Sequence, residues 1–196
     1  NGRSRWSTDT KLDLSAGPGV GPGLVAVGTN DGDVIALDAQ SGKKVWSVKV
    51  RSEVLSAPLI TTDRVVVRTV DGRIRALDAA TGKEQWTGEE PVPRLSLRGT
   101  APPVLSGETV LCGYDSGKVV AYALSNGDVL WQAQVSTPRG RSELERLADV
   151  DSAVRVAGND VYAVGYQGRI AMMALDSGQV WWGRELSSYR GLALDD

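Results

Sequence analysis

One ten-residue phrase occurs four times in this chain, and each copy ends in a tryptophan. The copies read LDAQSGKKVW, LDAATGKEQW, YALSNGDVLW and MALDSGQVWW, and they end at Trp46, Trp86, Trp131 and Trp182. In every copy a glycine stands four residues before the tryptophan, and another stands fourteen residues before it. Repeats of 40 to 51 residues in a chain of short apolar segments are typical of β-propellers, in which each repeat forms one blade.

Each repeat contains four segments with the pattern of a β-strand. Second strands are predicted at residues 24–28, 64–69, 109–113 and 161–165, and third strands at 33–37, 73–77, 118–122 and 169–173. The tryptophan lies on the fourth strand, and first strands are predicted near residues 57–59, 103–105 and 153–156. We therefore predict an all-β fold, a β-propeller of four-stranded antiparallel blades, forming one partial propeller domain over residues 1–196.

Both ends of the chain fall inside the repeat pattern. Trp6 stands 40 residues before Trp46, so we expect the chain to open with the last strand of an earlier blade. Residues 17–18 match the first-strand residues Ala57-Pro58, and residues 191–194 have the pattern of a strand of a further blade. These partial units predict that the chain is a fragment, of about four blades, of a longer propeller.

Composition excludes several kinds of chemistry. The chain has no histidine, which removes the commonest general base and zinc ligand and every Ser-His-Asp triad. A formal net charge of −2 offers no electrostatic attraction to nucleic acid. Cys112, the only cysteine, lies in an apolar segment, where a small buried side chain is more common than a reactive thiol. We predict no enzyme activity, no cofactor and no metal site.

Two groups of side chains could still carry chemistry. Asp149 and Asp151 are spaced so that they could hold a hard cation or act as acid and base. Carboxylates beside a strand start commonly accept backbone or arginine hydrogen bonds instead, and we favour that reading. The repeated tryptophans could stack a flat ligand, but one at the same strand position in every repeat favours packing between blades. That structural role is predicted for Trp46, Trp86, Trp131 and Trp182.

The links between blades grow longer along the chain. Link one covers residues 47–56, link two residues 87–101 and link three residues 132–152. Within link three, Ser142 and Glu145 have the spacing of a capping box, which predicts one or two helical turns. All links join an outer strand to the next inner strand, so they should emerge on one face. Long loops on one face are where a propeller commonly binds its partners.

The repeated ALDxxxGxxxW phrase resembles the repeat of the quinoprotein-like (PQQ-type) eight-bladed β-propellers. Two further phrases resemble the BamB family of outer-membrane lipoproteins, Leu95-Ser-Leu-Arg98-Gly99 in link two and Arg146-Leu-Ala-Asp149-Val-Asp151 in link three. The resemblance implies a scaffold subunit of the β-barrel assembly (BAM) machinery that binds the POTRA domains of BamA. The implied contact residues on this chain are Leu95, Leu97, Arg98, Asp149 and Asp151.

The same resemblance implies a location at the periplasmic face of the outer membrane of a Gram-negative bacterium. A lipid anchor outside this sequence would be the only membrane attachment, and unfolded outer-membrane proteins are possible clients. The third and fourth repeats depart from the family phrase at Tyr122-Ala123 and Met173-Ala174, although both glycines and the tryptophan remain.

The residues leave alternatives open. Arg98 and Asp151 come just before the inner strands of successive blades, so they should be neighbours on one face, with leucines beside them as in many interface hot spots. Arg98 could instead pair with Asp149 or Asp151 inside the protein, and Leu95 and Leu97 could be buried under the loop. Alternative functions are a fragment of a PQQ-dependent dehydrogenase, although an adjacent cysteine pair is absent, and a sensor or peptide-binding propeller.

Overall fold

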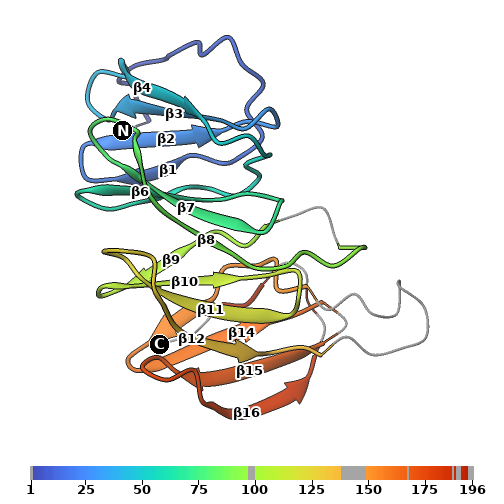
Figure 1. Ribbon diagram of the computed structural model, residues 1–196. Helices are drawn as coiled ribbons and strands as arrows, with labels where there is room; N and C mark the ends of the chain where they lie inside the picture. The colour runs from blue at the N-terminus through green and yellow to red at the C-terminus, as the bar shows by residue number, and fades with distance from the viewer. Residues whose placement is uncertain are drawn as a thin grey trace. The chain divides into compact units, whose positions relative to one another are not determined.

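The computed structural model describes residues 2–96, 100–137, 149–166, 168–186, 188 and 191–193. Within those ranges the chain forms four sheets of four antiparallel strands and no helix (Figure 1). None of the described residues therefore forms a helix long and apolar enough to cross a membrane. The all-β class and the four-stranded antiparallel blades predicted from the repeat are confirmed.

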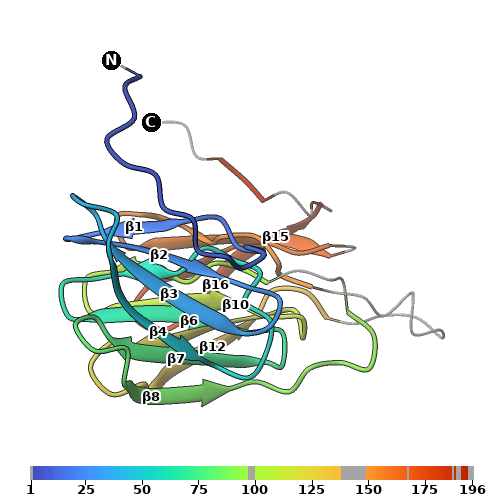
Figure 2. The ribbon, with the colours of Figure 1, turned by 90° about the horizontal axis from the view of Figure 1, so that it is seen from above.

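Residues 1–87 and residues 88–196 form two compact units. In the first unit, each sheet follows chain order from its first strand to its fourth (Figure 2). The first sheet consists of β1 (Gly19–Gly21), β2 (Leu24–Gly28), β3 (Asp33–Asp38) and β4 (Lys44–Lys49). The second consists of β5 (Leu59–Ile60), β6 (Arg64–Arg68), β7 (Arg73–Asp78) and β8 (Glu84–Glu89), whose last residues belong to the second unit.

The second unit repeats this arrangement. Its first sheet consists of β9 (Val104–Ser106), β10 (Thr109–Gly113), β11 (Lys118–Ala123) and β12 (Val129–Gln134). Its second sheet consists of β13 (Arg155–Ala157), β14 (Asp160–Val164), β15 (Arg169–Ala174) and β16 (Val180–Glu185). Three of the four sheets show the same irregularity between their third and fourth strands, where the register shifts just after the residue opposite the repeated tryptophan.

The first strands begin later than the sequence predicts. β5 starts at Leu59 rather than at Ala57, and β9 starts at Val104 rather than at Pro103. Proline has no N–H and cannot donate to a strand ladder, so pairing begins only after Pro58 and Pro103. The second and third strands lie within one residue of their predicted bounds.

Each unit has an apolar core between its two sheets. Strands β3, β6 and β11 are buried on both faces along most of their length, and their central residues form continuous apolar runs. In the first unit the core includes Ala26, Val34, Val54, Val65 and Val67, and in the second it includes Leu111, Val119, Val150, Val161 and Ala163. Each buried valine or leucine contributes about 1.5–3 kcal/mol relative to an exposed one, and these strands supply most of the core.

The tryptophan and the glycine of the repeat contact each other. The Trp46 indole donates to the backbone oxygen of Ala79 (2.8 Å), and the Trp131 indole donates to that of Leu175 (2.8 Å). A Cβ placed on Gly82 would lie 2.8 Å from the Trp46 ring, and one on Gly178 would lie 2.4 Å from the Trp131 ring. The glycine is required because the tryptophan of the preceding sheet occupies that space.

Tryptophans near the two ends behave differently from Trp46 and Trp131, which are 7% exposed. Trp182 is 40% exposed, and its indole nitrogen lies 2.9 Å from the sulfur of Met172. Trp6 donates to the Ala39 oxygen (3.0 Å), as the repeat requires. The predicted opening strand is absent, however, since residues 2–10 pair with no neighbouring strand among the described residues.

The predicted strand at residues 191–194 is also not formed by residues 191–193, and Leu194 lies outside the described residues. A strand needs a hydrogen-bonded neighbour to satisfy its backbone groups. In this segment the Leu192 oxygen instead accepts a hydrogen bond from the Arg155 side chain (3.1 Å).

Candidate partner-binding surface

Link three begins and ends beside one turn of the second unit, the β10–β11 turn at residues 114–118. At its beginning, the backbone N–H groups of Val135 and Ser136 donate to the Gly117 oxygen (2.9 and 3.0 Å). At its end, Val150 N–H donates to the Tyr114 oxygen (3.1 Å). The fold therefore fixes both described ends of link three at the same place.

Link two begins beside the same turn. Glu90 follows β8 directly, and its Oε2 accepts a hydrogen bond from Lys118 Nζ (3.0 Å) at the first residue of β11. Its Oε1 accepts one from Gln132 Nε2 (2.9 Å) on β12. The described beginning of link two and both described ends of link three thus lie on one face of the second unit, as the sequence predicts for links.

Leu95 is the one predicted contact residue of link two that the structure describes. It is 42% exposed, and Pro91, Val92 and Arg94 beside it are also exposed. The alternative that Leu95 is buried under the loop does not hold. Leu97 and Arg98 lie outside the described residues, so their positions and the pairing of Arg98 with an aspartate stay predictions.

The two aspartates of link three are not equivalent. Asp149 is 1% exposed and its backbone oxygen accepts a hydrogen bond from Tyr166 N–H (2.8 Å), whereas Asp151 is only partly buried. The same backbone bond recurs in the first unit between Glu53 and Val70 (3.1 Å). Repeat geometry therefore determines where Asp149 lies, and Asp151 is the less buried of the two aspartates.

Sequence reasoning missed the cluster of Glu90, Lys118 and Gln132. The signal was present in the repeat alignment. The residue four after the tryptophan is Val50 in the first repeat and Val135 in the third, and both are buried. Glu90 occupies that position in the second repeat, and a glutamate at an otherwise apolar core position indicates a local partner.

A hollow of about 520 Å³ lies in the second unit, lined in part by Thr109, Asp160, Asp176 and Trp181. These residues belong to the ends of β10, β14 and β15 opposite the β10–β11 turn, or to β16. The hollow is therefore separate from the links. Among the described residues, no three His, Cys, Asp or Glu side chains are placed so that they could hold a metal ion.

Comparison with solved structures defines the class of protein. The crystal structure of BamB from Moraxella catarrhalis matches with a TM-score of 0.90 and 32% identity, over 94% of this chain and 57% of that chain. A quinohemoprotein alcohol dehydrogenase from Pseudomonas putida HK5 matches with a TM-score of 0.73 over 90% of this chain and 35% of that chain, at 20% identity. The second likeness shows the fold alone. The chain is thus built of blades of the β-propeller class that carries PQQ-type repeats.

Sequence comparison then gives the family. The family model described as outer membrane protein assembly factor BamB matches residues 1–196. The BamB of Kangiella koreensis is 50% identical over 195 residues, and that of Bordetella pertussis is 41% identical over 197 residues; each match covers 100% of this chain. The chain belongs to the BamB family. It spans about half the length of these curated relatives, 50% and 51% respectively.

Proposed function

We propose that this protein is a non-catalytic scaffold subunit of the machinery that assembles β-barrel proteins in the outer membrane. It acts at the periplasmic face, held there by a lipid anchor outside this sequence, and it assists the insertion of unfolded outer-membrane proteins. Its relatives are named outer membrane protein assembly factors, which supports an assembly role over a dehydrogenase. The enzyme-like neighbours share the fold at 18–20% identity and support no activity here.

Links two and three bind the partner, a POTRA domain of the BamA type. One observation carries this proposal. The described beginning of link two and both described ends of link three lie beside the turn at residues 114–118, and Leu95 is exposed on link two. Arg98 follows Leu95 and Leu97 in the sequence; arginine is enriched at interface hot spots, and the leucines would add apolar surface beside it.

The test is calorimetric titration of the full-length protein with BamA POTRA domains, comparing wild type with Arg98→Glu and Leu97→Ala. Arg98→Glu should weaken binding by about 30-fold or more, because losing one side of a desolvated charge pair costs ~2–5 kcal/mol. Since blade packing does not depend on this surface link, the free energy of unfolding should change by only about 1 kcal/mol.

Leu12→Ala is the matched control, because Leu12 lies in the first unit, outside links two and three, and is 42% exposed, as Leu95 is. It should bind like wild type. Normal melting together with wild-type affinity in both link variants would show that the interface lies elsewhere. Loss of binding only through unfolding would make the link residues structural.

A separate assay addresses the dehydrogenase alternative. The full-length protein with PQQ and Ca²⁺ should show no saturable dye reduction, because the relatives that match the whole of this chain are named assembly factors and not dehydrogenases. Dye reduction that disappears in Asp149→Asn or Asp151→Asn would overturn the scaffold assignment.

A further inference from the structure

The base of link two is held by charge at a position where other repeats use an apolar side chain. Glu90 is 5% exposed, and the aligned Val50 is 5% exposed as well. Val50 belongs to the apolar core of the first unit, and the aligned Val135 belongs to that of the second. Valine at this position therefore packs well in two of the repeats. A role other than core packing must explain the glutamate at position 90.

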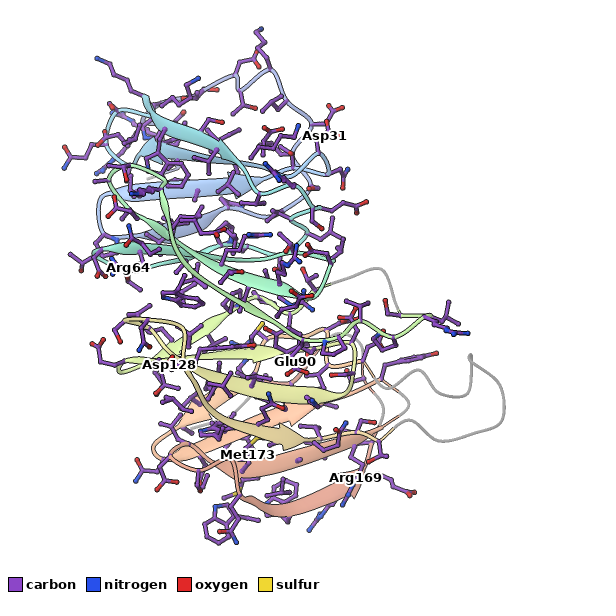
Figure 3. The ribbon with its side chains drawn as sticks, in the orientation of Figure 1. Asp31, Arg64, Glu90, Asp128, Arg169 and Met173 are labelled. Carbon is purple, nitrogen blue, oxygen red and sulfur yellow. The ribbon has the colours of Figure 1, made fainter. Side chains whose placement is uncertain are left out.

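The contacts of Glu90 are directional. Both carboxylate oxygens are used, one by Lys118 Nζ (3.0 Å) and one by Gln132 Nε2 (2.9 Å), and Lys118 Nζ also donates to Gln132 Oε1 (3.2 Å). These three side chains form a closed cluster, and Figure 3 labels Glu90 where link two begins. A buried ion pair seldom stabilises a fold more than apolar residues of similar volume do. Its distinctive property is that it fixes orientation.

The chain that follows Glu90 is stiff enough to carry that orientation outward. Link two continues as Pro91, Val92 and Pro93 before it reaches Leu95. Proline fixes its own φ and also restricts the residue before it to extended conformations. Glu90 and Val92 both precede a proline, so four consecutive residues have restricted backbones. The direction set at Glu90 is therefore transmitted to the exposed segment at residues 94–96.

We propose that Glu90, Lys118 and Gln132 form a latch that positions link two for partner binding. Glu90 is a positioning residue: it touches no partner, and it presents Leu95 in a binding-competent orientation by anchoring the rigid segment at residues 90–93. This inference rests on the proposed role of link two in binding a POTRA domain. Without the latch, the partner would have to order the link on binding, which weakens affinity without any loss of direct contacts.

The experiment compares Glu90→Val and Glu90→Gln with wild type in the full-length protein. Glu90→Val installs the residue found in the first and third repeats, so thermal stability should be kept while affinity for BamA POTRA domains falls about tenfold. Glu90→Gln keeps a side-chain oxygen for Lys118 and should bind within about threefold of wild type. Lys49→Met is the matched control, because it removes an exposed ion pair with Asp33 (3.8 Å) in the first unit.

Two readouts distinguish positioning from a general structural role. Hydrogen exchange at the amides of residues 92 and 94–96 should be faster in Glu90→Val than in wild type, with exchange in β11 and β12 unchanged. Leu95→Ala should weaken binding less in the Glu90→Val background than in wild type, because a link that is no longer oriented makes less use of Leu95.

The outcomes separate the two proposals. Unchanged exchange in link two, wild-type affinity of Glu90→Val, or additive effects of the two substitutions would each overturn the latch. If wild type itself does not bind POTRA domains, the proposed function fails, while faster exchange in Glu90→Val would still support the latch as the element that orders link two.

Discussion

The two units pack their sheets in the same way but place charge at opposite positions of the repeat. Eight residues before the tryptophan, the first unit has Asp38 and Asp78, whereas the second unit has Ala123 and Ala174. Four residues after the tryptophan, the first unit has Val50, whereas the second unit has Glu90 as well as Val135. The second unit thus lacks the aspartates at this turn position, and it has a glutamate at the base of link two.

The turn aspartates act locally. Asp38 Oδ1 accepts hydrogen bonds from Ser41 N–H (2.7 Å) and Ser41 Oγ (2.6 Å), and Asp78 Oδ1 accepts the same pair from Thr81 (2.9 and 2.7 Å). The second unit closes its aligned turns by other means. In the β11–β12 turn, Asn126 Nδ2 donates a hydrogen bond to Asp128 Oδ2 (2.6 Å). The carboxylate that closes a turn can thus stand at another position of the turn.

The charge at the base of link two is different because it joins separate elements. Glu90 lies in a connection, whereas Lys118 and Gln132 lie on two strands of one sheet. The comparison teaches that the repeat fixes packing and leaves charge free to vary. A buried charge at a repeat position that is otherwise apolar indicates a requirement that packing alone does not impose.

The largest expected effect tests the part that the units share. Trp46→Ala and Trp131→Ala should each lower the free energy of unfolding by ~3–5 kcal/mol, because each removes a buried indole and leaves a cavity between sheets. Chemical denaturation would measure both values. Trp182→Ala is the matched control and should cost much less, since Trp182 is 40% exposed. Clearly unequal costs for Trp46 and Trp131 would contradict the view that the units pack alike.

The next largest expected effect tests the ion pair between Glu90 and Lys118, in which the two units differ. Lys118→Met should cost about 2–3 kcal/mol, because it leaves the Glu90 carboxylate buried without its cation. Glu90→Val should change stability by no more than about 1 kcal/mol, since the Lys118 side chain, 31% exposed, can turn to water.

Arg73 supplies the control in the first unit. It is the basic residue aligned with Lys118, and its ion pair with Asp71 (3.4 Å) is partly exposed. Arg73→Met should cost less than about 1 kcal/mol. Equal losses for Arg73→Met and Lys118→Met in thermal or chemical melts would mean that Glu90 does not make the two units different.

The repeat made most of the fold predictable from sequence. Tryptophan and glycine at fixed spacing predict the blades, because the rings of Trp46 and Trp131 occupy the space that a side chain at Gly82 or Gly178 of the next sheet would need. First strands were placed too early because the repeat match includes Pro58 and Pro103, which cannot pair in a ladder. Trp6 matched the pattern without a strand, because a side-chain contact can persist where backbone pairing does not.

The candidate site was less predictable. The order of the strands predicts that the links lie on one face. The sequence did not decide whether Leu95 is exposed or buried under the loop. Asp149 is held in place by the hydrogen bond from Tyr166 N–H to its backbone oxygen, and no local sequence pattern predicts that bond. Glu90 belongs to no sequence motif. Its burial is indicated only by the residues aligned with it in other repeats, Val50 and Val135, which are both buried.

The smallest expected effect concerns the turn aspartates of the first unit. Hydrogen bonds from Ser41 and Thr81 hold the pKa of Asp38 and of Asp78 below the ordinary aspartate value. A carboxyl group with a depressed folded-state pKa stabilises the fold above its unfolded-state pKa, about 3.9, and this contribution is lost as the pH falls through the folded-state value.

Acid should therefore loosen the β3–β4 and β7–β8 turns before the aligned β15–β16 turn, where Ala174 stands at the position of Asp38 and Asp78. An NMR titration of the Ser41 and Thr81 amides below pH 4 would follow the loss, with the Gly178 amide, which donates to the Ala174 oxygen (2.9 Å), as the internal reference. In Asp38→Ala the Ser41 amide should no longer titrate, while Thr81 still does. If all three amides shift together, the acid response belongs to the whole fold, and exposed turn charge does not distinguish the first unit from the second.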